Sequence, residues 1–393
     1  MSFEILETET RGTIIKVVGV GGAGGNAVQH MIARGVQGVE FICANTDHQA
    51  LARSSSKNIL QLGRTGLGAG SRPEAGRAAA EEARDRIADA LRGAHMVFIT
   101  AGMGGGTGTG AAPIFAEIAK ELGILTVAVV SKPFEFEGPK RMKLAETGVT
   151  QLEDTVHSLI VILNNKLEEV MGEDAEMAEC FRAADDVLHN ACAGIAEIIN
   201  VPGLVNVDFE DVKTVMSEQG KAMMGTALTS GLDRARIAAE QAVASPLLEG
   251  VDLSGARGVL VNITASSSLK MKETREVMNT IRAFAADDAT VIFGTVCDEA
   301  IGDGLRVTVV ATGLGRAASK KQSTPFTVVR TGTDNAPLSI PIATSHGPSS
   351  DYSDFEKPAI WRTRESAQAR VAAMEDTGAE RYDIPAFLRK QAD

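Results

Sequence analysis

The sequence predicts a parallel, doubly wound α/β domain, followed by a long helix, a second and smaller α/β domain and a disordered C-terminal region. Three observations support this order. Near-continuous apolar runs alternate with helical patterns over the first 165 residues, a similar alternation resumes after residue 200, and the composition changes near residue 315. Apolar runs without polar alternation are typical of strands whose two faces are both covered by helices, as in parallel sheets.

The predicted elements follow in chain order. Strands of the first domain are expected at residues 13–20, 39–46, 95–100, 124–130 and 159–164, with helices between them that include residues 73–91 and 111–122. A long helix is expected at about residues 178–199. In the second domain, strands are expected near residues 258–264, 290–296 and 305–312, and the clearest helix at residues 270–285. Strands that alternate with helices in this way predict βαβ units.

Composition excludes several classes of protein. The chain of 393 residues has a net charge of −12, and its last 77 residues carry ten charges of each sign, so the acidic excess lies in the body. Such a body offers no broad basic face to nucleic acid. No apolar run approaches the ~18 residues that cross a bilayer, and the N-terminus has no secretory pattern, so direct membrane insertion is not expected.

The cysteines and histidines do not predict a metal centre. Cys43, Cys180, Cys192 and Cys297 lie far apart, and six scattered histidines form no cluster in the sequence. This spacing argues against a zinc site or a disulfide framework and suits reduced thiols in a cytosol.

The C-terminal region reads as a linker that ends in a short apolar peptide. From residue 317 to about 378, Ser, Thr, Pro and mixed charges dominate without a helical or strand period. Residues 380–393 then bring Tyr382, Ile384, Phe387 and Leu388 together in an otherwise polar stretch. A frayed terminus is the ordinary interpretation. Apolar anchors after a flexible spacer suggest instead a peptide that docks into the groove of a partner.

A glycine-rich loop follows the third predicted strand. Residues 102–110 read GMGGGTGTG, and the only side chains beyond glycine are Met103, Thr107 and Thr109. A strand, a loop almost without side chains and a helix N-terminus together form a recurrent phosphate-binding arrangement, because backbone N–H groups can approach the anion closely. A flexible linker is the alternative, but linkers are rarely held between a buried strand and an amphipathic helix.

A second glycine loop follows the first predicted strand. Residues 19–26 read GVGGAGGN, in which Gly19, Gly21 and Gly24 match the G-x-G-x-x-G dinucleotide pattern, and Asp47 follows the next strand. An NAD-dependent oxidoreductase is therefore a rival hypothesis. Two glycine loops at one sheet edge suit a nucleoside triphosphate better, since a dinucleotide needs one such loop. Neither loop carries the lysine of a P-loop, so backbone N–H groups, the two threonines and a metal ion must take its place.

An acidic pair lies in residues 206–212, NVDFEDV. Asp208 and Asp211 stand three residues apart, close together if a helix begins there. The structural interpretation is an N-cap and a first-turn acid that complements the helix dipole. The functional interpretation is a carboxylate pair that orients a water molecule for attack on a γ-phosphate.

Two further pairs have both a structural and a functional interpretation. Glu137 and Arg141 follow the fourth predicted strand and could contact a ribose and a phosphate, or form an ordinary surface ion pair. Phe181 and Asp185 could stack on and hydrogen-bond a purine, because a carboxylate accepts from the N1–H and 2-amino groups of guanine. Without further information, Phe181 is a core residue and Asp185 a surface residue.

Together these motifs resemble the FtsZ family of bacterial tubulin-like GTPases. GGGTGTG with GVGGAGGN, the NVDFEDV segment and the terminal DIPAFLRKQAD carry the resemblance, which runs from about residue 14 to 312 and resumes at residue 380. It implies a tubulin/FtsZ-like fold. The domains are then a flexible N-terminus (1–12), a GTP-binding domain (13–175), a central helix (176–201), a second, GTPase-activating domain (202–316), a disordered linker (317–379) and a C-terminal partner-binding peptide (380–393).

The resemblance also implies the site residues. GTP would be held by both loops and by residues matching ribose, phosphate and base contacts, namely Gly21, Gly22, Ala23, Gly24, Gly25, Asn26, Asn45, Gly104, Gly105, Gly106, Thr107, Gly108, Thr109, Gly110, Glu137, Arg141, Asn164, Phe181 and Asp185. Asn206, Asp208 and Asp211 would complete the active site of the next subunit in a head-to-tail filament. GTP or GDP with Mg²⁺, and a monovalent cation such as K⁺, are the implied cofactors. Two departures from the family are Asn165, where Asp is common, and Pro139, which interrupts a basic run.

The partners follow from the same resemblance. The chain would polymerise with itself in the cytoplasm, at the mid-cell division site beneath the inner membrane. The C-terminal peptide, with Tyr382, Asp383, Ile384, Pro385, Phe387 and Leu388, would bind the membrane anchors FtsA and ZipA and the regulators MinC and SlmA. A third hypothesis, a non-catalytic scaffold, rests on this docking peptide.

Overall fold

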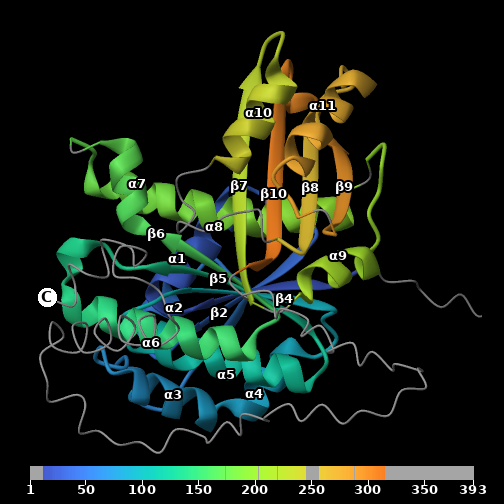
Figure 1. Cartoon of the computed structure of the whole chain (residues 1–393). Helices are drawn as coiled ribbons and strands as arrows, with labels where there is room; N and C mark the ends of the chain where they lie inside the picture. The colour runs from blue at the N-terminus through green and yellow to red at the C-terminus, as the bar shows by residue number, and fades with distance from the viewer. Residues whose placement is uncertain are drawn as a thin grey trace, which may run out of the picture. The chain divides into compact units, whose positions relative to one another are not determined.

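A mixed β-sheet organises the chain, as Figure 1 shows for the computed structural model. The structure describes residues 12–314, except residues 173, 202, 219, 245–255 and 287. The predicted linker and the C-terminal peptide lie outside the described residues. Within the described part, ten strands hydrogen-bond in the order β3-β2-β1-β4-β5-β6-β7-β10-β8-β9. The strands are β1 (Ile15–Val20), β2 (Val39–Asn45), β3 (Asn58–Gln61), β4 (Met96–Gly102), β5 (Leu125–Lys132), β6 (Ser158–Leu163), β7 (Gly220–Ser230), β8 (Gly258–Ala265), β9 (Thr290–Cys297) and β10 (Gly304–Leu314).

The first six strands are all parallel and confirm the predicted doubly wound domain. Their order, 3-2-1-4-5-6, reverses between β1 and β4, which pair directly from Ile15 and Met96 onward. Every residue of β1 is buried, as the uninterrupted apolar run predicts for a strand covered on both faces. In open sheets of this kind, ligands bind outside the carboxyl ends of the strands at the point of reversal. The fold therefore directs attention to the segments that follow β1 and β4.

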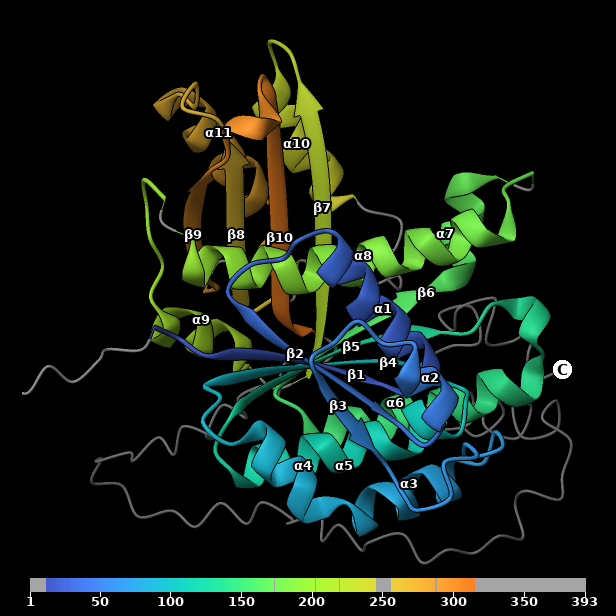
Figure 2. The same ribbon diagram turned by 180° about the vertical axis from the view of Figure 1, so that it is seen from behind.

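Helices cover both faces of these parallel strands. One hydrophobic core joins the sheet to α1, α8 and α9, and a second core joins its other face to α3, α4, α5 and α6. Figures 1 and 2 show these two layers from opposite sides. The helices are α1 (Gly21–Ala33), α2 (His48–Ala52), α3 (Pro73–Glu82), α4 (Arg84–Leu91), α5 (Thr107–Glu121), α6 (Pro139–Thr155), α7 (Asn164–Met171), α8 (Met177–Asn200), α9 (Phe209–Met216), α10 (Arg234–Val243) and α11 (Met271–Arg282), with 3₁₀ turns η1 (Glu135–Glu137) and η3 (Glu299–Ile301).

The second half of the fold continues the same sheet. β7 pairs with β6 in parallel over three residue pairs that begin at Ser158 and Gly220. β10 then pairs antiparallel with both β7 and β8, and β9 pairs in parallel with β8. α10 and α11 pack on this part of the sheet through a third core. The three strands predicted for this half are present, and β7 was not predicted because its sequence, GKAMMGTALTS, has glycine and alanine where strand formers are usual.

Two further differences from the sequence prediction concern short elements. The helix expected at residues 73–91 is interrupted at Ala83, which separates α3 from α4. No glycine or proline marks that position, so composition carries no signal for the break. β3 was also missed because its four residues, NILQ, supply a single buried side chain. None of the helices in the described ranges combines the length and apolar character that crossing a membrane requires.

α9 is anchored at the amino ends of the parallel strands. The hydroxyl of Ser158, the first residue of β6, donates to the carbonyl of Met216 at 2.7 Å, and Thr312 Oγ1 donates to the Val215 carbonyl at 2.7 Å. At the other end of α9, the Phe209 ring lies 6.0 Å from the ring of His95, measured between centroids. His95 directly precedes β4, and its Nδ1 accepts from the backbone N–H of Ile14, just before β1. Both ends of α9 therefore lie at the amino edge of the sheet.

Candidate functional site

The two glycine loops meet at the carboxyl edge, at the point where the strand order reverses. α1 begins at Gly21, directly after β1, and α5 begins at Thr107, with four residues between it and the end of β4. The loops approach so closely that a Cβ on Gly21 would lie 3.0 Å from the backbone nitrogen of Gly108. Two helix N-termini therefore present their unpaired N–H groups side by side, which is a favourable environment for an anion.

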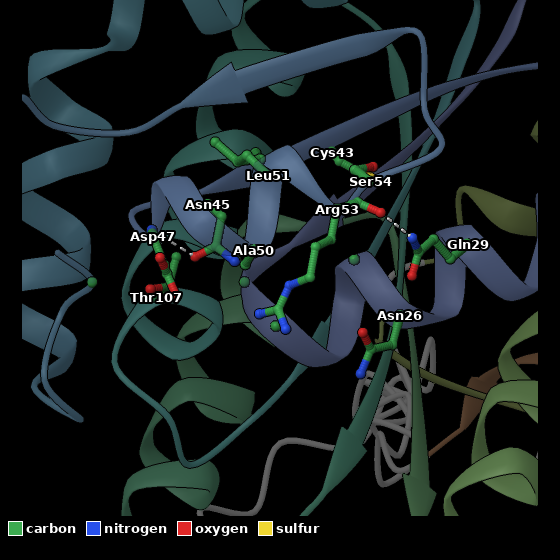
Figure 3. A pocket seen from close by; sticks show the side chains of 15 residues that line it. Asn26, Gln29, Cys43, Asn45, Asp47, Ala50, Leu51, Arg53, Ser54 and Thr107 are labelled. Carbon is green, nitrogen blue, oxygen red and sulfur yellow. Dashed lines mark hydrogen bonds between the residues drawn. The ribbon is translucent and has the colours of Figure 1, made fainter. Parts of the chain in front are cut away.

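Two adjoining clefts open at this edge. The first, of about 540 Å³, lies between α1, β2 and α2 and is called the α2 cleft (Figure 3). The second, of about 500 Å³, extends from the glycine loops to α8 and is called the α8 cleft. Gly22, Asn26 and Thr107 line both clefts, so the two spaces meet over the start of α1 and α5. An elongated polyanion with a base at one end suits such a continuous surface.

Most of the predicted nucleotide residues line these clefts. They come from six separate segments of the sequence that meet at one sheet edge. Those that line a cleft are Gly21, Gly22, Ala23, Gly25, Asn26, Asn45, Gly105, Gly106, Thr107, Gly108, Glu137, Arg141, Asn164, Phe181 and Asp185. Those that do not line either cleft are Gly24, Gly104, Thr109 and Gly110.

The glycines of the loops have two different physical roles. At Gly22, Gly25 and Gly105 a Cβ would meet no atom within 4 Å, so these positions leave room for a ligand against the backbone. At Gly24 and Gly110 a Cβ would lie 2.3 Å from the Thr100 carbonyl oxygen and 1.9 Å from that of Pro73. The glycines of this second kind permit the protein to pack on itself. Only some of the loop glycines therefore lie where an anion could approach the backbone closely.

The two threonines of the second loop also differ. Thr107 lines both clefts, and its hydroxyl lies 2.6 Å from the hydroxyl of Thr46. Thr109 is buried, and its Oγ1 accepts from the backbone N–H of Gly104 at 2.9 Å, at a residue whose φ is +94°. Thr109 thus holds the loop in shape from beneath, while Thr107 faces the space above it.

The far end of the α8 cleft has the features of a base and sugar site. Asn164 is 5% exposed, and its Oδ1 has no hydrogen-bond partner in the structure. An unpaired buried amide oxygen is costly, so a ligand donor at this position would be favourable. Phe181, which lines the same cleft, is 42% exposed and meets the Phe134 ring edge-on at a centroid distance of 5.3 Å.

Glu137 and Arg141 form the ion pair that their spacing allowed, and both line the α8 cleft. The Glu137 carboxylate also accepts from the backbone N–H of Phe134 at 3.0 Å. Asn165, one of the two departures from the family pattern, accepts from the N–H of Glu135 at 2.9 Å. These contacts hold the segment after β5 against the cleft, so the structural and the functional interpretations of the pair are compatible.

Asp185 lies in the wall of the α8 cleft, and its carboxyl has a raised pKa. Burial raises the pKa of its carboxyl to about 6, the charge of His30 opposes this rise, and the neighbouring carboxylate of Asp186 adds to it. Burial disfavours the ionised form because little solvent or donor stabilises the charge. A ligand that donates hydrogen bonds to this carboxylate, as the N1–H and 2-amino groups of guanine do, would supply that stabilisation.

The acidic pair, Asp208 and Asp211, lines neither of the two clefts. Asp208 is the N-cap of α9 and accepts from the N–H of Asp211 at 2.8 Å, while Asn206 Oδ1 accepts from the N–H of Gly203 at 2.7 Å. The structural interpretation of Asp208 is therefore confirmed. Because α9 lies at the amino edge, the seven residues of β4, roughly 20 Å at the usual rise, separate it from the glycine loops. Figures 1 and 2 show α9 at the end of the sheet opposite α7.

A third loop at the carboxyl edge was missed by the sequence reasoning. Residues 62–72 contain four glycines with positive φ, and Gly68 and Ser71 line the α2 and the α8 cleft respectively. Ser71 has a φ of +56°, the only positive value at a non-glycine residue in the described chain. Strained backbone of this kind is often found at binding sites. The close spacing of the glycines was the available signal, but no strong apolar strand precedes them to suggest a loop of this type.

The α2 cleft adds polar residues that were also not predicted as ligand contacts. Figure 3 shows the side chains of Gln29 and Arg53 on its wall, near the labelled Asn26. Asp47, the acidic residue that accompanied the glycine pattern in the NAD hypothesis, caps α2 by accepting from the N–H of Gln49 at 2.9 Å. Its carboxylate therefore has a structural task in this fold.

The residues beside the glycine loops fit a metal ion that is bound together with phosphate. Among the residues the structure describes, no three His, Cys, Asp or Glu side chains gather in a way that could hold an ion. The Thr107 hydroxyl lines both clefts beside the open glycines. Mg²⁺ accepts a hydroxyl oxygen together with phosphate oxygens and water, so these residues fit a Mg²⁺–nucleotide complex.

Comparisons with known proteins agree with this geometry. A family described as "Tubulin/FtsZ family, GTPase domain" matches residues 14–172, and "FtsZ family, C-terminal domain" matches residues 220–315. The sequence is 54% identical to the cell division protein FtsZ of Coxiella burnetii over 99% of both chains, and 53% identical to that of Pseudomonas aeruginosa over the whole of both. The solved structure titled "FtsZ dimer, empty" from M. jannaschii has a TM-score of 0.74 and 41% identity, covering 78% of this chain and 89% of that one.

Substitution of two loop glycines should separate binding from folding. Gly105→Ser adds a side chain in open space, so we expect the variant to fold normally and to bind GTP at least about tenfold more weakly, since it occupies ligand volume. Gly110→Ala is the matched control, because its Cβ would collide with the Pro73 carbonyl and lower stability without facing the cleft. Thermal unfolding and fluorescent-GTP titration measure the two effects. Equal loss of stability in both variants would contradict the assignment.

The acidity of Asp185 should appear in the pH dependence of GTP binding. The carboxylate must be ionised to accept from guanine, and its pKa in the free protein is about 6, so affinity should fall as the pH drops from 7.5 to 5.5. Asp185→Asn does not titrate and should show weaker binding with a smaller pH dependence. The phosphates of GTP titrate equally with the unmodified protein and with Asp185→Asn, so their effect cancels when the two pH curves are compared. Parallel curves for the two proteins would refute the role of Asp185.

Proposed function

This chain belongs to the FtsZ family and is a tubulin-like GTPase that functions in cell division, and we propose that it assembles head to tail into filaments in which GTP is hydrolysed between two copies. One observation carries the proposal. The phosphate-binding edge and the acidic pair lie at opposite edges of one sheet, roughly 20 Å apart along β4. A single copy cannot bring Asp208 to its own glycine loops, whereas a second copy stacked in the same direction can.

Head-to-tail stacking is a heterologous contact, because the carboxyl edge of one copy meets the amino edge of the next. Such a contact repeats without closing and generates a filament. The M. jannaschii structure titled as an FtsZ dimer supports self-association of a relative with 41% identity. In this proposal the acidic end of α9 in one copy completes the clefts of its neighbour.

Nucleotide binding is assigned to the two clefts. The phosphates would lie over the N-termini of α1 and α5, where Gly22, Gly25 and Gly105 leave the backbone accessible. The base would lie against Phe181, with its donors toward Asp185, at the far end of the α8 cleft. Glu137 and Asn164, which line the wall between, are assigned to the sugar and base.

Hydrolysis requires positioning and charge stabilisation more than covalent chemistry. Backbone N–H groups of both glycine loops would stabilise the charge that develops on the transferred phosphoryl group. Thr107 would hold Mg²⁺ together with the phosphate oxygens, and Mg²⁺ when bound would neutralise part of that charge. Asp208 and Asp211 of the neighbouring copy would orient the attacking water and accept its proton. A monovalent cation such as K⁺ is compatible with this scheme.

Filament turnover follows from this arrangement. The γ-phosphate lies at the contact between copies, so its loss removes interactions from that contact and weakens the filament. We place these filaments in the Z ring, at the mid-cell division site beneath the inner membrane. The C-terminal peptide would link the filaments to FtsA and ZipA and would bind MinC and SlmA. Its residues lie outside the described part of the chain.

Asp208→Asn tests the catalytic assignment without removing the helix cap. Asparagine caps a helix as well as aspartate does, so α9 should stay intact while one carboxylate is lost. We expect unchanged GTP binding and filament formation, with turnover lowered by at least about a hundredfold. Glu210→Gln is the control, because Glu210 lies in the same helical turn and contacts Lys213 at 3.4 Å. Near-normal phosphate release by Asp208→Asn would contradict the proposal.

A further inference from the structure

An ion-pair bridge joins α1 to α8 beside the base end of the α8 cleft. Oδ1 of Asp186 on α8 lies 2.7 Å from His30 Nε2 and accepts from Arg34 Nη2 at 2.6 Å. His30 lies in the last turn of α1 and Arg34 is the C-cap of that helix, one turn later, so both reach the same carboxylate. The His30 ring also meets the ring of His189 edge-on, at a centroid distance of 6.2 Å.

The two bridged helices carry the two ends of the site. α1 begins at Gly21, within the first glycine loop, and α8 carries Asp185 immediately before Asp186. α1 crosses α8 in Figure 2. A contact that fixes this crossing therefore fixes the distance between the phosphate-binding N–H groups and the carboxylate assigned to the base.

Stability alone does not account for this bridge. The Asp186 side chain is 39% exposed and that of Arg34 is 55% exposed, so this arm of the bridge contributes little to folding free energy. The other arm is more buried, since the His30 side chain is 19% exposed. The bridge also places a second carboxylate directly beside Asp185, which is unfavourable for an ionised Asp185. Asp186 repels an ionised Asp185 and adds little folding free energy, so a role in orienting the two helices explains its place better.

We propose that Asp186, held by His30 and Arg34, is a positioning residue for guanine recognition, because it sets the base-reading turn of α8 relative to the phosphate-binding helix α1. This inference rests on the proposed assignment of Asp185 to the base. It deepens that assignment by naming what holds Asp185 in place and what controls its charge.

The charges around Asp185 make the inference specific. His30 and Arg34 contact Asp186, the neighbour of Asp185 on α8, and the ring of His189 lies against that of His30. The α8 cleft that Asp185 lines is also lined by Lys132, Glu137 and Arg141. Burial has the largest effect on the pKa of Asp185 and raises it, the charge of His30 lowers this pKa, and the charge of Asp186 raises it. Asp186→Asn should therefore shift the pH midpoint of GTP binding downward, and His30→Gln should shift it upward.

The test compares GTP with ITP, which lacks the 2-amino group, in binding titrations of the full chain. At pH 8, well above the pKa of about 6 of Asp185 in the unmodified protein, we expect Asp186→Asn and His30→Leu to weaken GTP binding on the order of tenfold and to reduce the preference for GTP over ITP. His30→Gln should retain most of the affinity, because an amide can still donate to Asp186. Arg34→Gln removes one of the two donors and should have an intermediate effect.

Glu197→Gln is the matched control. Glu197 lies on the same helix and pairs with Arg306 at 2.9 Å, on a contact between α8 and β10 that does not reach the α8 cleft. Its GTP affinity and base preference should match those of the unmodified protein, and thermal unfolding verifies that every variant is folded.

The outcomes separate this inference from the proposed function. If Asp185→Asn lowers the preference for GTP over ITP but Asp186→Asn and His30→Leu leave affinity and preference unchanged, the positioning role is wrong and the base assignment stands. If Asp185→Asn itself leaves the preference unchanged, the base assignment fails and the inference fails with it. If the pH midpoint of GTP binding moves in the same direction in Asp186→Asn and in His30→Gln, the inferred effect of these two charges on Asp185 is wrong.

Discussion

The close approach of two helix N-termini at the carboxyl edge of the sheet is the constraint on which the rest of the structure depends. α1 and α5 start where β1 and β4 diverge, and their loops pack backbone against backbone. A Cβ on Gly21 of the first loop would lie 3.0 Å from the backbone nitrogen of Gly108 in the second, and Gly21 has a φ of +78°, so a side chain is disfavoured at this contact. The excluded side chains leave N–H groups and open space where a polyphosphate can bind.

The length of the strands then decides where the chemistry can occur. β1 and β4 hold the glycine loops at their carboxyl ends. At their amino ends lie His95 and α9, and Asp208 caps α9. Buried hydroxyls of Ser158 and Thr312 fix α9 in that place through its last carbonyls. A rigid sheet therefore keeps the glycine loops and the acidic pair apart, and under the proposed mechanism assembly is a condition of turnover.

The sequence predicted what depends on neighbouring residues and missed what depends on distant ones. Apolar runs and glycine loops indicated the parallel sheet and its phosphate-binding edge, because strand burial and helix starts leave local patterns. Local patterns could not show that Gly110 packs on Pro73, or that Gly105 faces open space. The bridge between His30 and Asp186 joins residues 156 positions apart, and only the crossing of two helices brings them together.

Complementation between two defective variants tests the shared site most directly. Asp211→Asn should bind GTP but offer its neighbours an incomplete acidic pair, while Gly105→Ser should offer an intact pair but bind GTP poorly. In a mixture, the acidic edge of Gly105→Ser can meet the GTP-filled clefts of Asp211→Asn. Phosphate release from the mixture should therefore exceed the sum of the two variants measured alone. Release equal to that sum, at concentrations where mixed filaments form, would contradict an active site built from two copies.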